Sequence, residues 1–287
     1  MITSKPTLKP DAKKVTHLSL LCFHLAQLSF IMSQVNVHIW SVPKTGSTVM
    51  SKSFACRSDS YNLVEPFLSE KNQSAARLLD VVPRRPDYLA VKQLLDQKHE
   101  GKSLVVSKEH AFVYQPWIRL QEFGSLIMDE PKHIILFRHP LRAMKSYQFI
   151  LSSAQPSHTV PAELRHEEVS FLPLKQVFEH TYPNNIVVDF EDVVQDPRKY
   201  FSRLCEMLEI PDESERMASW EGRQTTVDQI IQEPDNEIWF QTLRNSSGFD
   251  RSVLNQRDHI QLPNQMLKIV EENFQVFDFL SLYKLQC

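Results

Sequence analysis

A short segment early in the chain carries the residue types that bind a phosphate group, and it runs Pro43-Lys44-Thr45-Gly46-Ser47-Thr48. An apolar run precedes the segment and a helical pattern follows it. Backbone N–H groups at the start of a helix, together with the helix dipole, attract an anion. Gly46 lets the backbone approach the ligand closely, and Lys44 supplies a positive charge. Further hydrogen-bond donors are the hydroxyls of Thr45, Ser47 and Thr48. The alternative is an ordinary strand-to-helix turn in which Thr48 caps the helix.

The order of residues in this segment argues against an ordinary nucleoside triphosphatase. The Walker pattern G-x-x-x-x-G-K-[ST] places its lysine directly after the second glycine. Here Lys44 precedes Gly46. The segment therefore predicts a phosphate site of another kind, and an ATPase, a GTPase or a P-loop kinase is not favoured.

A second candidate phosphate site follows a later apolar run, residues 133–137. Arg138 is expected at the carboxyl end of this strand, which is where ligands bind in open parallel sheets. Pro140 then begins a helix, and Ser146 lies about two turns along it. A guanidinium fork and a hydroxyl can together hold a second phosphate. Alternatively, Arg138 pairs with a carboxylate and Ser146 is an ordinary helical residue.

An α/β fold must position these two segments. Strands are predicted at residues 35–41, 62–64, 103–107, 133–137 and 185–189. Helices are predicted at residues 46–55, 74–80, 88–97, 141–151, 197–208 and 264–274. This alternation predicts a parallel sheet with helices on both faces, formed by residues 35–287 as one domain. Residues 156–173 are predicted to form a mobile loop near the mouth of the substrate site.

Composition narrows the class of protein further. The formal net charge of -3 argues against a nucleic-acid-binding protein, which would carry a basic excess. The 4 cysteines show no paired spacing, which predicts neither a zinc site nor a disulfide framework and favours a reducing, cytoplasmic compartment. Residues 15–32 form an apolar run that polar residues interrupt, so residues 1–34 are predicted to be a leader or packed helix. A membrane anchor of the Golgi type II kind is the alternative.

Taken together, the two candidate phosphate segments resemble those of the P-loop sulfotransferase family. The loop at residues 43–48 is similar to the loop with which the family binds a 5′-phosphosulfate. The family's 3′-phosphate motif, an arginine followed by a proline and then by Ser-Tyr, is similar to Arg138, Pro140, Ser146 and Tyr147. A third similarity is the run at residues 188–197, where the family has a late strand and an acidic turn.

The resemblance implies that the co-substrate is 3′-phosphoadenosine 5′-phosphosulfate (PAPS) and that the fold is of the P-loop type. Residues 44–48 would hold the 5′ side of PAPS, and Arg138 with Ser146 would hold its 3′-phosphate. No metal is implied. The acceptor would be a hydroxyl group of a small molecule or a glycan, which the sequence does not specify. Residues 243–251 lack the glycine-rich closing segment of the cytosolic enzymes. A nucleotide-binding protein that lost catalysis is therefore the second hypothesis, and Arg244 or Arg251 is a weaker candidate for a 3′-phosphate contact.

Sulfonate transfer needs a base opposite Lys44, which would stabilise the leaving oxygen, and three residues are candidates. His110 is expected just past a strand end, and Lys108-Glu109-His110 is similar to a Lys-x-His of the cytosolic enzymes. Glu65 belongs to Glu65-Pro66-Phe67, which is similar to a Glu-Pro-Phe motif in a related branch; that branch also has an Arg-x-Asp turn like Arg57-Ser58-Asp59. Glu109 is the third candidate.

Overall fold

The computed structural model describes residues 34–65, 101–114, 132–153, 166–225, 227, 240 and 243–287. Internal contacts divide the chain into two units, residues 1–34 and 35–287, and the strands and helices of the described residues belong to the second. The apolar run at 15–32 and the predicted helices at 74–80 and 88–97 lie outside the described residues. Among the helices that are described, none is both long enough and apolar enough to span a bilayer.

Five parallel strands form one sheet in the order β2-β3-β1-β4-β5. Their bounds are β1 (Val35–Ser41), β2 (Ser60–Val64), β3 (Leu104–His110), β4 (Lys132–Phe137) and β5 (Asn185–Asp189). Because the strands are parallel, their carboxyl ends share one edge of the sheet. After β1 the chain forms β2 and then β3 on one side of β1, and it later adds β4 on the other side. The carboxyl end of β1 is therefore the switch point at which open α/β sheets bind ligands.

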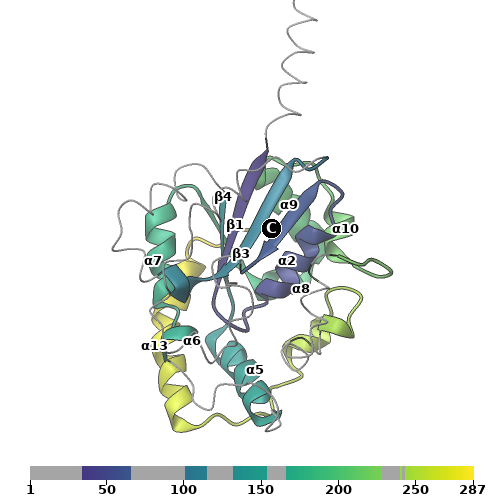
Figure 1. The fold of residues 1–287 in the computed structure, drawn as a ribbon. Helices are drawn as coiled ribbons and strands as arrows, with labels where there is room; N and C mark the ends of the chain where they lie inside the picture. Colours follow the sequence, from purple (N-terminus) through teal and green to yellow (C-terminus); the bar gives the residue numbers. More distant parts are fainter. Residues whose placement is uncertain are drawn as a thin grey trace, which may run out of the picture. The chain divides into compact units, whose positions relative to one another are not determined.

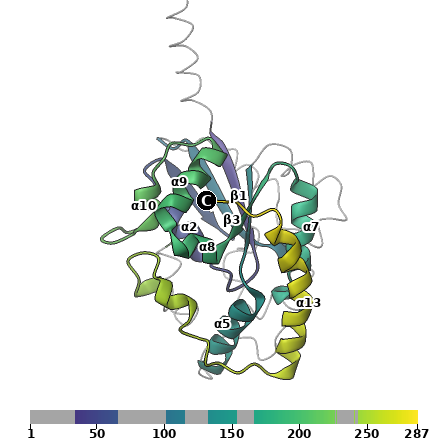
Figure 2. The same cartoon turned by 180° about the vertical axis from the view of Figure 1, so that it is seen from behind.

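Helices cover both faces of the sheet, as the two opposite views in Figures 1 and 2 show. Apolar side chains of one face pack with α2 (Ser47–Ala55), α8 (Phe190–Gln195), α9 (Pro197–Leu208) and α10 (Ser214–Ala218). The other face packs against α7 (Leu172–Thr181) and α13 (Asn264–Ser281). Helix α5 (Pro140–Ser153) packs along α13. Both faces are thus buried, which explains why consecutive residues of β1, β3 and β4 are buried, their polar side chains included. The predicted fold class is confirmed.

Several predicted boundaries were wrong: β2 begins earlier than the predicted 62–64, and α13 runs seven residues beyond the predicted 264–274. Strand β3 runs on to His110, because Lys108 and Glu109 continue the ladder in register with Ile39 and Trp40 of β1. Pairing with a buried neighbour outweighs the low strand propensity of charged residues. The predicted mobile loop at 156–173 is, in its described part, ordered into the short helix α6 (His166–Val169) and the start of α7. Pro173 fits the first turn of α7, where a missing N–H is not needed.

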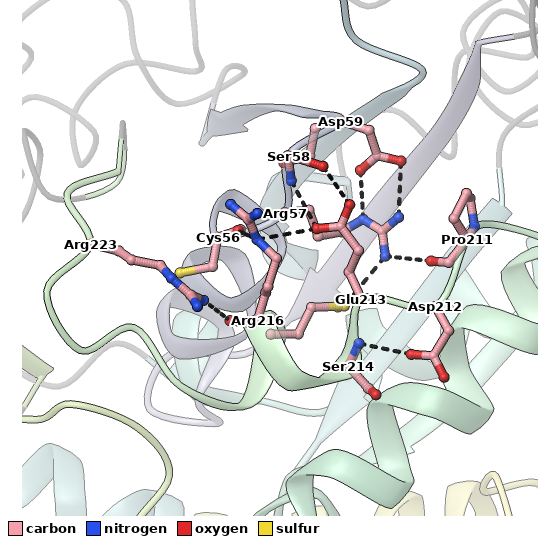
Figure 3. A network of polar contacts seen from close by, with 12 residues as sticks. Cys56, Arg57, Ser58, Asp59, Pro211, Asp212, Glu213, Ser214, Arg216 and Arg223 are labelled. Carbon is pink, nitrogen blue, oxygen red and sulfur yellow. Dashed lines mark hydrogen bonds and ion pairs between the residues drawn. The ribbon is translucent and has the colours of Figure 1, made fainter.

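A buried arginine fixes the turn between α2 and β2 (Figure 3). The Arg57 guanidinium donates two hydrogen bonds of 2.9 Å to the Asp59 carboxylate and one of 3.0 Å to the carbonyl of Pro211. Next to it, the N–H of Ser58 donates to the Glu213 carboxylate at 3.0 Å. These contacts fasten the start of β2 to the connection between α9 and α10. The predicted Arg-x-Asp turn therefore lies at the amino ends of the strands, where it positions β2 without touching the candidate site.

Candidate functional site

The predicted phosphate loop follows β1 at the carboxyl edge of the sheet. Its backbone is left-handed at Lys44 (φ 67) and at Gly46 (φ 93), and Gly46 is the N-cap of α2. The alternative in which Thr48 caps the helix is wrong, because the cap is Gly46 and no side chain makes a capping hydrogen bond. A glycine N-cap has no side chain to bond to the first N–H groups of α2, and a helix start of this kind can bind an anion.

The side chain of Thr45 stabilises the turn of the phosphate loop. Its side chain is buried, and its hydroxyl donates to the carbonyl of Val42 at 2.7 Å. Its backbone N–H donates to the same carbonyl at 3.3 Å. Thr45 therefore closes the turn that presents Lys44, and its own contact with a phosphate stays a prediction.

Arg138 directly follows β4 and touches the phosphate loop. Its Nη1 donates to the carbonyl of Lys44 at 3.4 Å, and its Nε forms an ion pair of 3.5 Å with Glu191 of α8. Arg142 pairs with the same carboxylate at 2.6 Å. Arg138 therefore pairs with a carboxylate, as the alternative expected, and it lies at the carboxyl edge of the sheet, while its contact with a phosphate stays a prediction. Ser146 is buried two turns along α5, as its spacing predicts.

Arg257 is a cation of this edge that the sequence did not single out. Its charge lowers the pKa of both Lys44 and Arg138, after the larger effect of burial, so it lies within electrostatic range of both anchors. Its guanidinium lies 4.6 Å from the centre of the Phe149 ring on α5. Arg251, which the sequence suggested, is exposed and donates to the carbonyl of Gln195. No pattern around Arg257 indicates its position, because it depends on how the tail folds back.

Lys44 lies in a strongly positive surrounding. Burial, followed by the charges of Arg257 and Lys108, lowers the pKa of Lys44 to about 7, and Glu65 only partly opposes this. At neutral pH the ammonium is therefore close to losing its proton. A bound anion would raise the pKa of Lys44 and keep its ammonium protonated. A site whose buried cations repel one another in this way therefore favours an anionic ligand.

Glu65, Lys108 and His110 form a cluster on the side of the sheet that faces Lys44. Lys108 is buried, and its Nζ contacts the Glu65 carboxylate and lies 3.1 Å from Nε2 of His110. The same Nε2 lies 3.1 Å from Oε1 of Glu65. Successive residues of a strand point to opposite faces, so the buried Glu109 lies on the other face of β3. The structure thus unites two of the three candidate bases and leaves Glu109 apart from them.

The backbone of Glu65 is itself unusual. Its φ is 53, a left-handed conformation that costs a residue with a side chain about 1–3 kcal/mol. Its N–H donates to the carbonyl of Lys108 at 2.7 Å, which continues the pairing of β2 with β3 by one residue. Left-handed residues that persist tend to cluster at functional sites. Lys44 and Glu65 are two such residues on the same edge.

Charges within the cluster set the protonation states. Burial alone would raise the pKa of Glu65, but the charge and the hydrogen bond of Lys108 hold that pKa well below its usual value. Burial and the charge of Lys108 lower the pKa of His110, and Glu65 opposes them. At neutral pH Glu65 is therefore a carboxylate and His110 a neutral imidazole.

Comparison with known proteins identifies the family. The family described as Sulfotransferase domain matches residues 35–259, which is most of the chain. The chain belongs to this family. Among solved structures, the sulfotransferase domain of an olefin synthase from Synechococcus PCC 7002 superposes with a TM-score of 0.59 at 17% identity, covering 88% of this chain and 97% of that one. A sulfotransferase domain of the curacin biosynthetic pathway gives 0.57 at 16% identity, covering 89% and 99%. At these identities the likeness shows the fold of the sulfotransferase domain alone.

Two plant proteins also match this chain in sequence. The branched-chain-amino-acid aminotransferase-like protein 2 of Arabidopsis thaliana is 30% identical over 219 residues, and its paralogue 1 is 26% identical over 216 residues. Each match covers 74% of this chain but only 36% of the plant protein. The chain thus spans about a third of the length of these relatives.

Proposed function

We propose that the chain transfers a sulfonate group from PAPS to a hydroxyl acceptor. The observation that carries the proposal is the hydrogen bond between Arg138 and the carbonyl of Lys44, which joins the two expected phosphate anchors at the switch point of the sheet. Arg257 adds positive charge towards both anchors. In this arrangement Lys44, the loop at 43–48 and the start of α2 receive the 5′-phosphosulfate. Arg138 and Ser146 receive the 3′-phosphate.

The reaction needs positioning and charge stabilisation more than covalent chemistry by the protein. The acceptor oxygen attacks sulfur and forms a new O–S bond, while the bond from sulfur to the bridging oxygen of the 5′-phosphate breaks. The electron pair stays on that oxygen, where the Lys44 ammonium stabilises it. The acceptor proton passes to a base of the Glu65–His110 pair, so the products are a sulfate ester and adenosine 3′,5′-bisphosphate.

The acceptor is proposed to be a small-molecule or glycan hydroxyl, and no nucleic acid or membrane partner is needed for the reaction. Residues 35–287 are proposed to act as one domain. Membership of the branch with a Glu-Pro-Phe motif stays a prediction, because residues 66 and 67 lie outside the described part of the chain.

The test is transfer of labelled sulfonate from PAPS to a panel of alcohols, phenols and glycans. Lys44→Ala and Arg138→Ala are expected to lower both transfer and binding of adenosine 3′,5′-bisphosphate by calorimetry. Lys175→Ala is the matched control, since Lys175 pairs with Glu179 on the exposed side of α7. Absence of both transfer and nucleotide binding would contradict the proposal.

A nucleotide-binding protein without catalysis is the second candidate. The contact of Lys108 with Glu65 favours it, because an ammonium held against a carboxylate weakens that carboxylate as a base. Tight binding of PAPS, without turnover on any acceptor and with no change in Glu65→Gln, would support this candidate. Turnover that Glu65→Gln abolishes would exclude it.

A further inference from the structure

The contacts of Lys108 pose a question about protons. Its Nζ contacts both Oε1 of Glu65 and Nε2 of His110, and these two atoms are themselves 3.1 Å apart. An ammonium can only donate hydrogen bonds, and a carboxylate can only accept them. A neutral imidazole nitrogen carries either a proton or a lone pair. Nε2 of His110 can therefore serve Lys108 or Glu65, but not both.

The other ring nitrogen of His110 decides between the two. Ser41 donates its hydroxyl hydrogen to the carbonyl of Glu109 at 3.2 Å. The Ser41 oxygen is then left as an acceptor, and it lies 3.5 Å from Nδ1 of His110. A proton on Nδ1 gives each ring nitrogen of His110 a hydrogen-bond partner, because Nδ1–H can then donate to the Ser41 oxygen. Nε2 then keeps its lone pair and accepts a hydrogen bond from Lys108.

We propose that Lys108 sets the proton arrangement of the site: it holds His110 in the Nδ1–H form with the Nε2 lone pair occupied, so that Glu65 takes the acceptor's proton. The second half of this inference rests on the proposed function. Lys108 thus acts through His110 by fixing the position of its proton, and of the two candidate bases it leaves Glu65 as the one that accepts the proton. In the reaction, the proton leaves the acceptor oxygen as the O–S bond forms and ends on the carboxylate of Glu65.

Burial supports this assignment. Lys108 is fully buried, and burial of a cationic side chain is unfavourable unless charges and hydrogen bonds compensate it, so Lys108 holds its two partners firmly. Oε1 is the oxygen of Glu65 that contacts Lys108 and lies 3.1 Å from Nε2 of His110. The Glu65 side chain is 32% exposed and that of His110 is 16% exposed. The Glu65 carboxylate is therefore the more accessible of the two candidate bases.

Removal of Lys108 makes a directional prediction. In Lys108→Met, the imidazole proton is expected to move to Nε2, where it can donate to Glu65. The charge of Lys108 lowers the pKa of His110 and Glu65 raises it, so the pKa of His110 should rise in this variant. Lys108→Arg keeps the charge and the donors, and should retain the Nδ1–H form.

The experiment uses the full chain with ¹⁵N-labelled histidine and no nucleotide. Long-range ¹H–¹⁵N spectra at pH 8 report which nitrogen of His110 carries the proton, with His110→Asn identifying the signal. Nδ1–H in the wild type and in Lys108→Arg, with Nε2–H in Lys108→Met, supports the proposal. Nε2–H in the wild type overturns it. Should Lys108→Met fail to fold, Glu65→Gln replaces it: Lys108 remains, so Nδ1–H must persist, and loss of that form overturns the proposal.

Kinetics then test the assignment of the base. With any acceptor that the wild type sulfonates, Glu65→Gln should lower kcat by about 10²–10⁴-fold, and His110→Asn should lower it less. The reverse order overturns the assignment to Glu65. A wild type that shows the Nδ1–H form but transfers no sulfonate contradicts the proposed function, while it supports the role of Lys108 in setting the protons.

Discussion

The phenyl ring of Phe190, at the start of α8, occupies the space that a Cβ atom on Gly46 would need. A Cβ built at Gly46 overlaps three atoms of this ring, and the backbone there has a φ of 93. The Arg138 guanidinium lies over the same ring, with its Cζ 5.5 Å from the ring centre. One aromatic side chain thus packs against both phosphate anchors, and the glycine lets the loop approach it.

Gly46→Ala should therefore weaken nucleotide binding far more than the left-handed backbone of residue 46 would cause by itself. The overlap forces the loop or Phe190 to move, which displaces the N–H groups at the start of α2. We expect the affinity for adenosine 3′,5′-bisphosphate to fall by more than tenfold, measured by calorimetry. Gly101→Ala is the matched control: its φ is 70, but nothing lies within 4 Å of the added Cβ. That variant should lose about 1 kcal/mol of stability and keep its affinity. Equal affinities in the two variants would contradict the role of the contact with Phe190.

The lowered pKa of Lys44 predicts how nucleotide binding depends on pH. In the free protein the pKa is about 7, and a bound anion raises it. Affinity should be fully present below pH 7 and should fall as the pH rises from 7 towards the bound-state pKa, because Lys44 must then take up a proton on binding. Calorimetry between pH 7 and pH 9, in two buffers of different ionisation enthalpy, measures this uptake. Lys44→Arg keeps its charge throughout the range and should show neither the slope nor the uptake. A wild type whose affinity is flat over the same range would show that Lys44 is already charged in the free protein.

Arg257 is expected to contribute to binding through its charge. Arg257→Leu removes the cation that acts on both Lys44 and Arg138, and the affinity for adenosine 3′,5′-bisphosphate should fall about 10–100-fold. The same variant should raise the pKa of Lys44, since Arg257 lowers it. The pH at which affinity begins to fall should therefore move upwards. Arg251→Leu is the control, because Arg251 is exposed and bonds to a backbone carbonyl of α8. If both variants bind equally well, Arg257 does not face the nucleotide.

Features that depend on neighbouring residues were predictable, and features that depend on strand register were not. The strand, the loop at 43–48 and the helix after it follow from adjacent residues. The Glu65–Lys108–His110 cluster instead depends on the pairing of Val64 in β2 with Lys108 in β3. These residues are far apart in the sequence, and no local pattern specifies that they pair. The sequence therefore presents Glu65 and His110 as competitors, whereas the fold makes them neighbours. Arg257 was missed for the same reason, because the tail brings it back to the sheet edge.

The ion pair of Arg57 with Asp59 predicts a large effect on stability that is independent of activity. The Arg57 side chain is fully buried, and Arg57→Met would leave the carboxylate of Asp59, only 18% exposed, without its partner. Removing one member of a buried pair costs about 3–5 kcal/mol, which urea unfolding would measure.

Burial alone would raise the pKa of Asp59, but the bonds from Arg57 lower it below its unfolded value. The contribution is therefore present above about pH 4 and is lost as the pH falls further, so the difference between wild type and variant should shrink in acid. Arg203→Ala on α9 breaks an exposed pair with Glu206 and should leave stability unchanged. If Arg57→Met proved as stable as Arg203→Ala, the turn before β2 would not depend on the ion pair.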